Sequence, residues 1–103
     1  MNTIKNQITL IGNIGNQPEV TLFENGAKIA RFQLATNEVS KDKKQTEWHK
    51  LFAWGNVADF IENFGKKGKK IAVSGRLVNR TYLNKSGQSK KTTEIEVRHV
   101  IGL

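Results

Sequence analysis

The feature that most constrains this chain is an alternation of apolar and polar residues with a period of two, which recurs in long segments along the sequence. In the first segment, from Ile4 to Ile14, the even positions are mostly apolar or glycine and the odd positions are mostly polar. This period is typical of a β-strand with one buried face. It predicts further strands over Ala27 to Glu38, Thr46 to Trp54, Ile71 to Leu83 and around Ile95 to Ile101. The chain is therefore predicted to be mainly β.

The segments between these strands carry signals of turns and loops. Asn25-Gly26 lies between Val20 to Phe23 and the second predicted strand, and both residues tolerate the positive φ values of a type I′ hairpin turn. The segment from Val39 to Gln45 is rich in lysine and has no apolar periodicity, so it is predicted to be an exposed loop. Asn84 to Ser89 is predicted to be a second, glycine-containing loop.

One short helix is predicted between the third and fourth strands. Asn56 is a favourable N-cap residue, and apolar side chains then repeat at i, i+3, i+4 and i+7: Val57, Phe60, Ile61 and Phe64. Five strands with one helix between strands 3 and 4 are the element order of the OB-fold, an all-β, five-stranded Greek-key barrel that binds oligonucleotides or oligosaccharides. An SH3-like barrel would lack this helix, and a ferredoxin-like fold would need two. At 103 residues, the chain is expected to form a single domain, residues 1–103.

Several classes of function are excluded by what the sequence lacks. There is no cysteine, which excludes disulfides, thiolate zinc sites and iron–sulfur clusters. His49 and His99 lie far apart, no loop matches a phosphate-binding motif, and Glu94 and Glu96 alternate with core residues as solvated side chains would. We therefore expect no enzyme activity, no cofactor and no metal. With neither an apolar run of about 18 residues nor a signal peptide, we expect a cytoplasmic protein without a membrane partner.

The balance of charge indicates a polyanionic partner. The 17 lysines and arginines outnumber the 9 acidic residues, which leaves a net charge of +8 and a pI of about 10.0. A field of this sign attracts nucleic acid first and anionic membranes second. The alternative is that the positive charge only keeps a small domain soluble.

The third predicted strand is apolar on both faces, unlike the other strands. If Leu51 and Ala53 point into the barrel, alternation places four residues on the outer face: Trp48, Lys50, Phe52 and Trp54. The fourth strand repeats this pattern with three outer residues: Arg76, Arg80 and Tyr82. Aromatic rings stack on bases and cations contact phosphates, so these residues are predicted to bind single-stranded DNA or RNA.

A stripe of aromatic residues on a strand has a structural alternative, which is a dimer interface or a second buried layer. The cations argue against it, because burying Lys50, Arg76 and Arg80 in a dry interface would cost several kcal/mol each. A phosphate backbone supplies the partners that these cations need. Three runs of lysine lie in connections that an OB barrel can bring beside the same face: Lys41/Lys43/Lys44, Lys66/Lys67/Lys69/Lys70 and Lys85/Lys90/Lys91.

Specific motifs follow one another along nearly the whole chain: Ile11 to Gly15, Pro18 to Val20, Asn25-Gly26, Ala30 to Thr36, Gln45 to His49 and Gly75 to Leu77. In this order and spacing, the chain closely resembles the bacterial single-stranded DNA-binding protein family. The resemblance implies an OB-fold that usually forms a homotetramer, wraps single-stranded DNA without sequence preference, and acts in DNA replication, recombination and repair. It also implies that Trp48, Trp54 and Tyr82 stack on bases and that Lys50 contacts phosphate.

Two departures from the family pattern change what is expected. Many relatives have a further stacking tryptophan where this chain has Ser40, so one stacking platform is expected to be missing. The flexible linker and acidic C-terminal tip of the family, which recruit replication and repair proteins, are expected to be absent because the chain stops at Leu103. Two other classes of function remain open: an OB-fold protein-interaction module of the primosome type, and an RNA-binding cold-shock-like domain.

Overall fold

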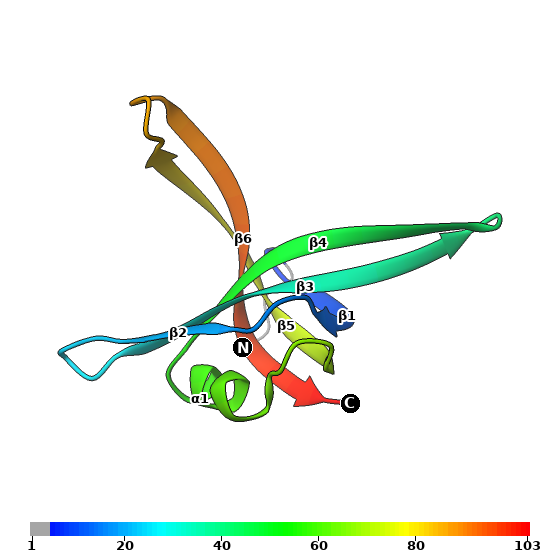
Figure 1. The fold of residues 1–103 in the computed structure, drawn as a ribbon, viewed down its shortest axis with the longest axis horizontal. Coiled ribbons are helices and arrows are strands. Elements are labelled where there is room, and N and C mark those ends of the chain that lie inside the picture. The colour runs from blue at the N-terminus through cyan, green and yellow to red at the C-terminus, as the bar shows by residue number, and fades with distance from the viewer. Residues whose placement is uncertain (1–4) are drawn as a thin grey trace.

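Six strands and one helix follow one another in this computed structural model, which describes residues 5–103 (Figure 1). The strands are β1 (Ile8–Ile14), β2 (Glu19–Leu22), β3 (Lys28–Ser40), β4 (Lys43–Trp54), β5 (Lys70–Leu83) and β6 (Ser89–Gly102), and the helix is α1 (Gly55–Phe64). The predicted start of the first strand, Ile4, lies outside the described residues. The predicted strands are confirmed, although residues 5–7 of the first predicted strand are not in a strand, and β4 and β6 are longer than the alternation indicated.

Five of the six strands close into a barrel. Backbone pairing runs in the order β1-β5-β6-β4-β3, and β3 pairs back to β1 where Asn13 lies opposite Ala35. Strands β4 and β6 run parallel, and the other neighbours in this ring run antiparallel. The short strand β2 pairs with β3 outside the ring. A closed five-stranded barrel with its helix between the third and fourth barrel strands is the OB-fold, as predicted.

The core of the barrel is filled by the inward positions of the alternating strands. The largest fully buried side chains are those of Ile14, Leu34, Leu51, Ile61 and Ile71. Burying an aliphatic side chain of this size contributes about 1.5 to 3 kcal/mol. Helix α1 packs against β3, β4 and β6, with Ile61 facing the core. At ten residues α1 is too short to cross a bilayer, and residues 5–103 contain no longer helix.

Helix α1 begins earlier than predicted and without a side-chain cap. It starts at Gly55, so Asn56 lies in its first turn, and the prediction that Asn56 caps the helix is wrong. An ion-pair cluster links the helix to β3, because the ammonium group of Lys28 lies 2.8 Å from Asp59 and 2.7 Å from Glu62. The hydrogen bonds to Asp59 and then Glu62 raise the pKa of Lys28 to about 12.

The region from Val39 to Gln45 is a hairpin and not the exposed loop that was predicted. Strands β3 and β4 stay paired as far as Ser40 opposite Lys43, and the chain reverses through Lys41 and Asp42, with φ values of 47° and 67°. Positive φ at both central residues is the mark of a type I′ turn. Backbone hydrogen bonds between the strands form this hairpin without burying apolar side chains, so apolar periodicity could not indicate it.

The turn at Asn25-Gly26 is not of the predicted type I′. Only Gly26 of these two residues has a positive φ, of 89°. The Gly26 N–H donates to the Phe23 carbonyl over 2.9 Å, and the Phe23 N–H donates to the Ala27 carbonyl over 2.8 Å. This pattern is a three-residue loop in which glycine supplies the left-handed residue after a type I turn. The Asn25 side chain accepts a hydrogen bond from the Ala27 N–H instead.

Two long hairpins project from the barrel in different directions (Figure 1). We define the β3–β4 arm as residues 37–47 and the β5–β6 arm as residues 79–91, and nearly all residues of both arms are exposed. The radius of gyration is 14.8 Å, whereas a compact chain of this length has about 13 Å. The arms account for the excess, because they extend polar surface beyond the barrel.

Candidate nucleic-acid interface

The three aromatic residues predicted to stack on bases are exposed on the outer surface. On β4, Trp48 is 60% exposed and Trp54 is 43% exposed, and on β5 Tyr82 is 51% exposed. Leu51 and Ala53, which lie between the two tryptophans in sequence, are buried in the core. The predicted alternation of β4 is therefore confirmed at both of its tryptophans.

Each tryptophan contacts another segment of the chain. A Cβ atom at Gly15 would collide with the Trp48 ring, so any other residue at position 15 would require the indole to shift. The Trp54 ring lies beside Phe23, with the centroids 6.1 Å apart and the planes tilted by 31°. Such contacts restrict the motion of both indoles before any ligand arrives, which lowers the entropic cost of stacking on them.

Phe52 is buried, so the prediction that it is exposed on this face is wrong. Only 7% of its surface is exposed. Arg31 lies opposite Phe52 in the β3–β4 pairing, and its guanidinium carbon is 5.7 Å from the centroid of the phenyl ring. A guanidinium above an aromatic ring is a favourable cation–π arrangement. Phe52 therefore supports Arg31 in this structure and presents little ring surface to solvent.

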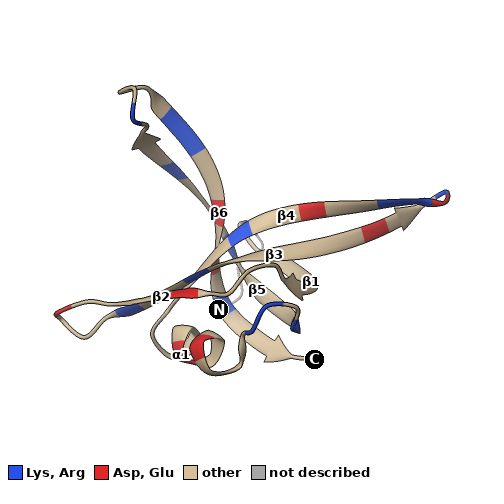
Figure 2. Ribbon diagram, in the orientation of Figure 1, with Lys and Arg blue, Asp and Glu red and all other residues tan. Residues whose placement is uncertain are grey.

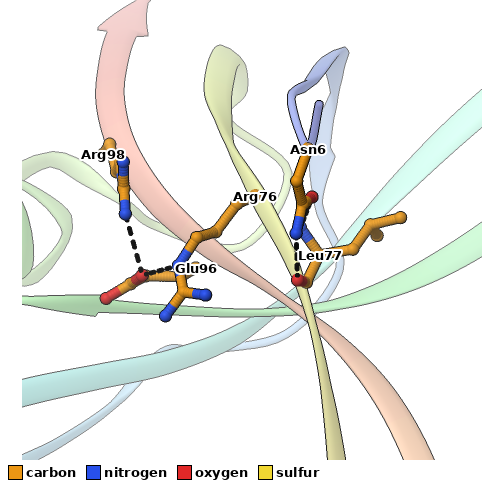
Figure 3. A network of polar contacts seen from close by, with 5 residues as sticks. All are labelled: Asn6, Arg76, Leu77, Glu96 and Arg98. Carbon is orange, nitrogen blue, oxygen red and sulfur yellow. Dashed lines mark hydrogen bonds and ion pairs between the residues drawn. The ribbon is translucent and has the colours of Figure 1, made fainter. Parts of the chain in front are cut away.

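Arg76 and Arg80 lie on β5 as predicted, but both contact glutamates of β6. Arg76 Nε donates to Glu96 Oε1 over 2.7 Å (Figure 3), and a guanidinium nitrogen of Arg80 lies 3.7 Å from Glu94 Oε1. Glu94 is only 8% exposed, so the expectation that it is a solvated side chain is wrong. The pairing of β5 with β6, which sets Arg76 opposite Glu96, creates these contacts.

The side chain of Asn6 continues the pairing between β1 and β5 beyond the N-terminal end of β1. Asn6 Oδ1 accepts a hydrogen bond from the Leu77 N–H over 2.8 Å, and Asn6 Nδ2 donates to the Leu77 carbonyl over 3.0 Å (Figure 3). The amide thus takes the place of a strand residue beside β5. This contact holds the strand just before the segment that carries Arg80 and Tyr82.

Lys50 lies between the two tryptophans along β4. It lines two clefts of about 300 and 320 Å³, the first shared with Arg31 and Glu94 and the second with Trp48. Basic residues also lie near the ends of both arms (Figure 2), which carry six of the predicted lysines: Lys41, Lys43, Lys44, Lys85, Lys90 and Lys91. The run at positions 66–70 leads into the start of β5, at the opposite end of that strand from its arm (Figure 2).

Sequence reasoning missed two residues of this surface, Arg31 and Phe23. Arg31 alternates with the buried residues Ala30 and Phe32, so its outward direction is visible in the sequence. Its position over Phe52 depends on the register between β3 and β4, which alternation does not supply. The contact of Phe23 with Trp54 has no local signal, because it joins the turn after β2 to the end of β4.

The two histidines do not form a metal site. His49 is half-buried on β4, with its Nε2 atom 3.0 Å from Thr36 Oγ1 on the paired strand β3. His99 is exposed on β6. Across residues 5–103, no three side chains of the metal-binding types His, Asp and Glu are grouped as ligands.

Comparisons with known proteins agree with this architecture. The family model described as "Single-strand binding protein family" matches residues 5–103 of the sequence. Single-stranded DNA-binding protein 1 of Chlorobaculum tepidum is 41% identical over 96 residues, covering 87% of this chain and 59% of that protein, so the chain spans less than two thirds of this relative. A solved structure described as "Plasmodium falciparum SSB complex with ssDNA" matches with a TM-score of 0.88 and 34% identity, over 100% of this chain and 99% of the other.

Proposed function

The chain belongs to the single-strand binding protein family, and from this premise we propose that it binds single-stranded DNA without sequence preference. The observation that carries the proposal is that three rings, Trp48, Trp54 and Tyr82, are exposed on the strands β4 and β5, which also carry exposed lysines. Every base has a flat π-face, so stacking does not select a sequence. Residues 1–103 would act as one binding domain that protects single strands during replication, recombination and repair, at the nucleoid in the cytoplasm.

The parts of the surface have separate roles in this proposal. Bases stack on the three exposed rings, and phosphates lie against Lys50 and the lysines of the two arms. The Phe52 ring packs against the Arg31 guanidinium, and Arg76 and Arg80 lie beside the path of the DNA strand. Ser40, at the end of β3, has no ring to offer a base. Binding of this kind makes and breaks no covalent bond, so we propose a binding protein that is not an enzyme and needs no cofactor.

Titration with oligo(dT) tests this function through the intrinsic fluorescence of the protein. Trp48 and Trp54 are the only tryptophans of the chain, and both are exposed, so stacked bases are expected to quench their emission. A duplex of equal length is expected to bind much more weakly, because its bases are already stacked on one another. Unquenched emission with oligo(dT), or tighter binding of an rU oligomer of the same length, would contradict the proposal.

We also propose a homo-oligomer, the tetramer that the resemblance to this family implies. An exposed apolar row crosses three strands and supports this proposal. Ile11 on β1 lies opposite Ala72 on β5, and Ala72 lies opposite Ile101 on β6. Ile11 is 56% exposed and Ile101 is 64% exposed. Contiguous exposed apolar side chains of this kind are typical of surfaces that bind another protein chain.

Sedimentation equilibrium at micromolar concentration is expected to give a mass several times that of one chain. The variant Ile11→Glu with Ile101→Glu is expected to shift the mass towards the monomer, because it places carboxylates in an apolar contact. Leu22→Glu is the matched control, since Leu22 is 68% exposed on β2 and lies outside the barrel ring. A monomeric wild type would overturn the proposed oligomer and leave the proposed binding surface unaffected.

A further inference from the structure

Glu94 is a buried carboxylate within the proposed DNA-binding surface. It is the one buried charged side chain among residues 5–103 and lines the same cleft as Lys50. Its Oε1 atom accepts a hydrogen bond from Arg31 over 3.1 Å and lies 3.7 Å from a guanidinium nitrogen of Arg80. Arg31 belongs to β3, Glu94 to β6 and Arg80 to β5. One carboxylate oxygen therefore links guanidinium groups from two other strands of the barrel.

The neighbouring Glu96 holds the remaining arginines in the same way. Arg76 donates to Glu96 over 2.7 Å, and Arg98 lies 3.9 Å from the same oxygen (Figure 3). The 17 basic residues of the chain comprise four arginines and 13 lysines. All four arginines lie within 4 Å of one of these two glutamates. Of the 13 lysines, only Lys28 has an ion pair within residues 5–103. Within residues 5–103, the arginines are thus paired with carboxylates, whereas the lysines other than Lys28 are not.

This division affects how phosphates can bind. A guanidinium presents a planar set of donors that suits phosphate, but a donor that already contacts a carboxylate is not free to contact another anion. A phosphate that takes the Arg31 or Arg80 nitrogen now at Glu94 leaves that carboxylate buried with fewer partners, which is unfavourable. The carboxylate also repels a phosphate that approaches the cleft. Free lysines carry neither penalty.

We propose that Glu94 limits the affinity of this surface for single-stranded DNA, because it holds Arg31 and Arg80 in internal ion pairs that a phosphate must displace. The lysines then make most of the phosphate contacts, and the bound strand exchanges faster than the number of basic residues would suggest. This inference rests on the proposed function. The opposite role is that Glu94 orients the two guanidinium groups towards the DNA. The two roles predict opposite effects when the charge of Glu94 is removed.

The deciding variant is Glu94→Gln, which keeps the volume and a carbonyl oxygen acceptor while removing the negative charge. We expect this variant to bind oligo(dT) roughly three- to tenfold more tightly than the wild type, mainly through slower dissociation. We also expect its plot of log affinity against log salt to be steeper by about 0.7 for each phosphate that Arg31 or Arg80 newly neutralises. A purely structural role of Glu94 would leave this salt slope unchanged.

Glu62→Gln is the matched control. It changes the net charge by the same amount, but Glu62 lies on α1 and contacts Lys28, which also keeps its contact with Asp59. We expect its affinity to stay within about twofold of the wild type, because Glu62 lines neither cleft of Lys50, Lys28 keeps its contact with Asp59, and an exposed charge is screened by salt. In the background of Arg80→Gln, the gain from Glu94→Gln is expected to shrink, since one of the two released cations is then missing.

Each outcome supports or overturns the inference. Weaker binding by a folded Glu94→Gln, an unchanged salt slope, or an equal gain from Glu62→Gln overturns it. If Glu94→Gln does not fold, Arg80→Gln alone decides: a loss below about threefold supports a guanidinium that is held by Glu94, and a larger loss shows that the guanidinium already contacts DNA and overturns the inference. If the wild type itself does not bind oligo(dT), the proposed function has failed, whereas a binding wild type with no gain in Glu94→Gln refutes this inference alone.

Discussion

Replacing both Trp48 and Trp54 by alanine is expected to weaken the binding of oligo(dT) by about 2 to 6 kcal/mol per subunit, or roughly 30- to 20,000-fold. Each base stacked on an aromatic side chain contributes about 1 to 3 kcal/mol. Along β4 the two positions lie about 20 Å apart, so the two losses are expected to be additive. The double variant contains no tryptophan, so its binding cannot be followed by intrinsic fluorescence. Fluorescence anisotropy of a labelled oligomer therefore measures the affinity of the single and double variants.

The same variants are expected to change the free energy of unfolding little, because Trp48 is 60% and Trp54 43% exposed and no core volume is lost. Phe64→Ala is the matched control for removing an exposed ring, since Phe64 is 57% exposed and is the last residue of α1, at the opposite end of the helix from Trp54. Its affinity for oligo(dT) is expected to stay unchanged. Phe32→Ala, in the core, is expected to cost about 3 to 5 kcal/mol of stability instead. If Trp54→Ala unfolds the domain without altering affinity, the aromatic surface is structural and the interaction-module alternative gains support.

Raising the salt concentration from about 50 mM to about 200 mM is expected to weaken binding roughly 300-fold if about six phosphates are neutralised. The reason is the release of condensed counterions, with a slope near −0.7 in log affinity against log salt for each phosphate on a single strand. Lys50 and the six lysines of the arms are among the cations available for this role, since none of them has an ion pair within residues 5–103. An affinity that does not change with salt would contradict a mechanism in which the protein follows the phosphate backbone.

The contribution of the β3–β4 arm to this salt dependence can be isolated. Replacing Lys41, Lys43 and Lys44 by glutamine is expected to reduce the slope by about 2, because up to three phosphates lose their partners. The matched control replaces Lys66, Lys67 and Lys69, which gives the same change of charge near the start of β5, at the opposite end from its arm. Equal reductions in both variants would mean that the overall charge of the protein, and not the arm, determines the slope.

The barrel and the exposure of its aromatic residues could be predicted from sequence because both depend on local periodicity. Side chains of a strand alternate between its two faces whichever strand becomes its neighbour. Once Leu51 and Ala53 are assigned to the core, Trp48 and Trp54 must therefore lie outside, as the structure confirms. The helix was likewise visible from its spacing of apolar residues, since Ala58 and Ile61, three residues apart, both turn towards the core as neighbours on one helix face do.

The paired region from Val39 to Gln45 could not be predicted in the same way. Its side chains are exposed, so no burial pattern distinguishes a strand from a loop there. The strands are held by backbone hydrogen bonds, which every residue except proline can form and which leave no trace in composition. The turn at Lys41 and Asp42 also lacks the glycine that usually indicates a type I′ turn.

The sequence by itself determined the fold class, the excess of positive charge, and the outward position of Trp48, Trp54 and Tyr82. Each of these follows from composition or from alternation within one segment of the chain. Only the tertiary structure decided which charges are free. The register between β3 and β4 places Arg31 over Phe52 and buries that ring, and the pairing of β5 with β6 brings arginines to Glu94 and Glu96. These contacts join residues from strands far apart in sequence, so whether a cation is available to a phosphate depends on long-range strand pairing that no local pattern encodes.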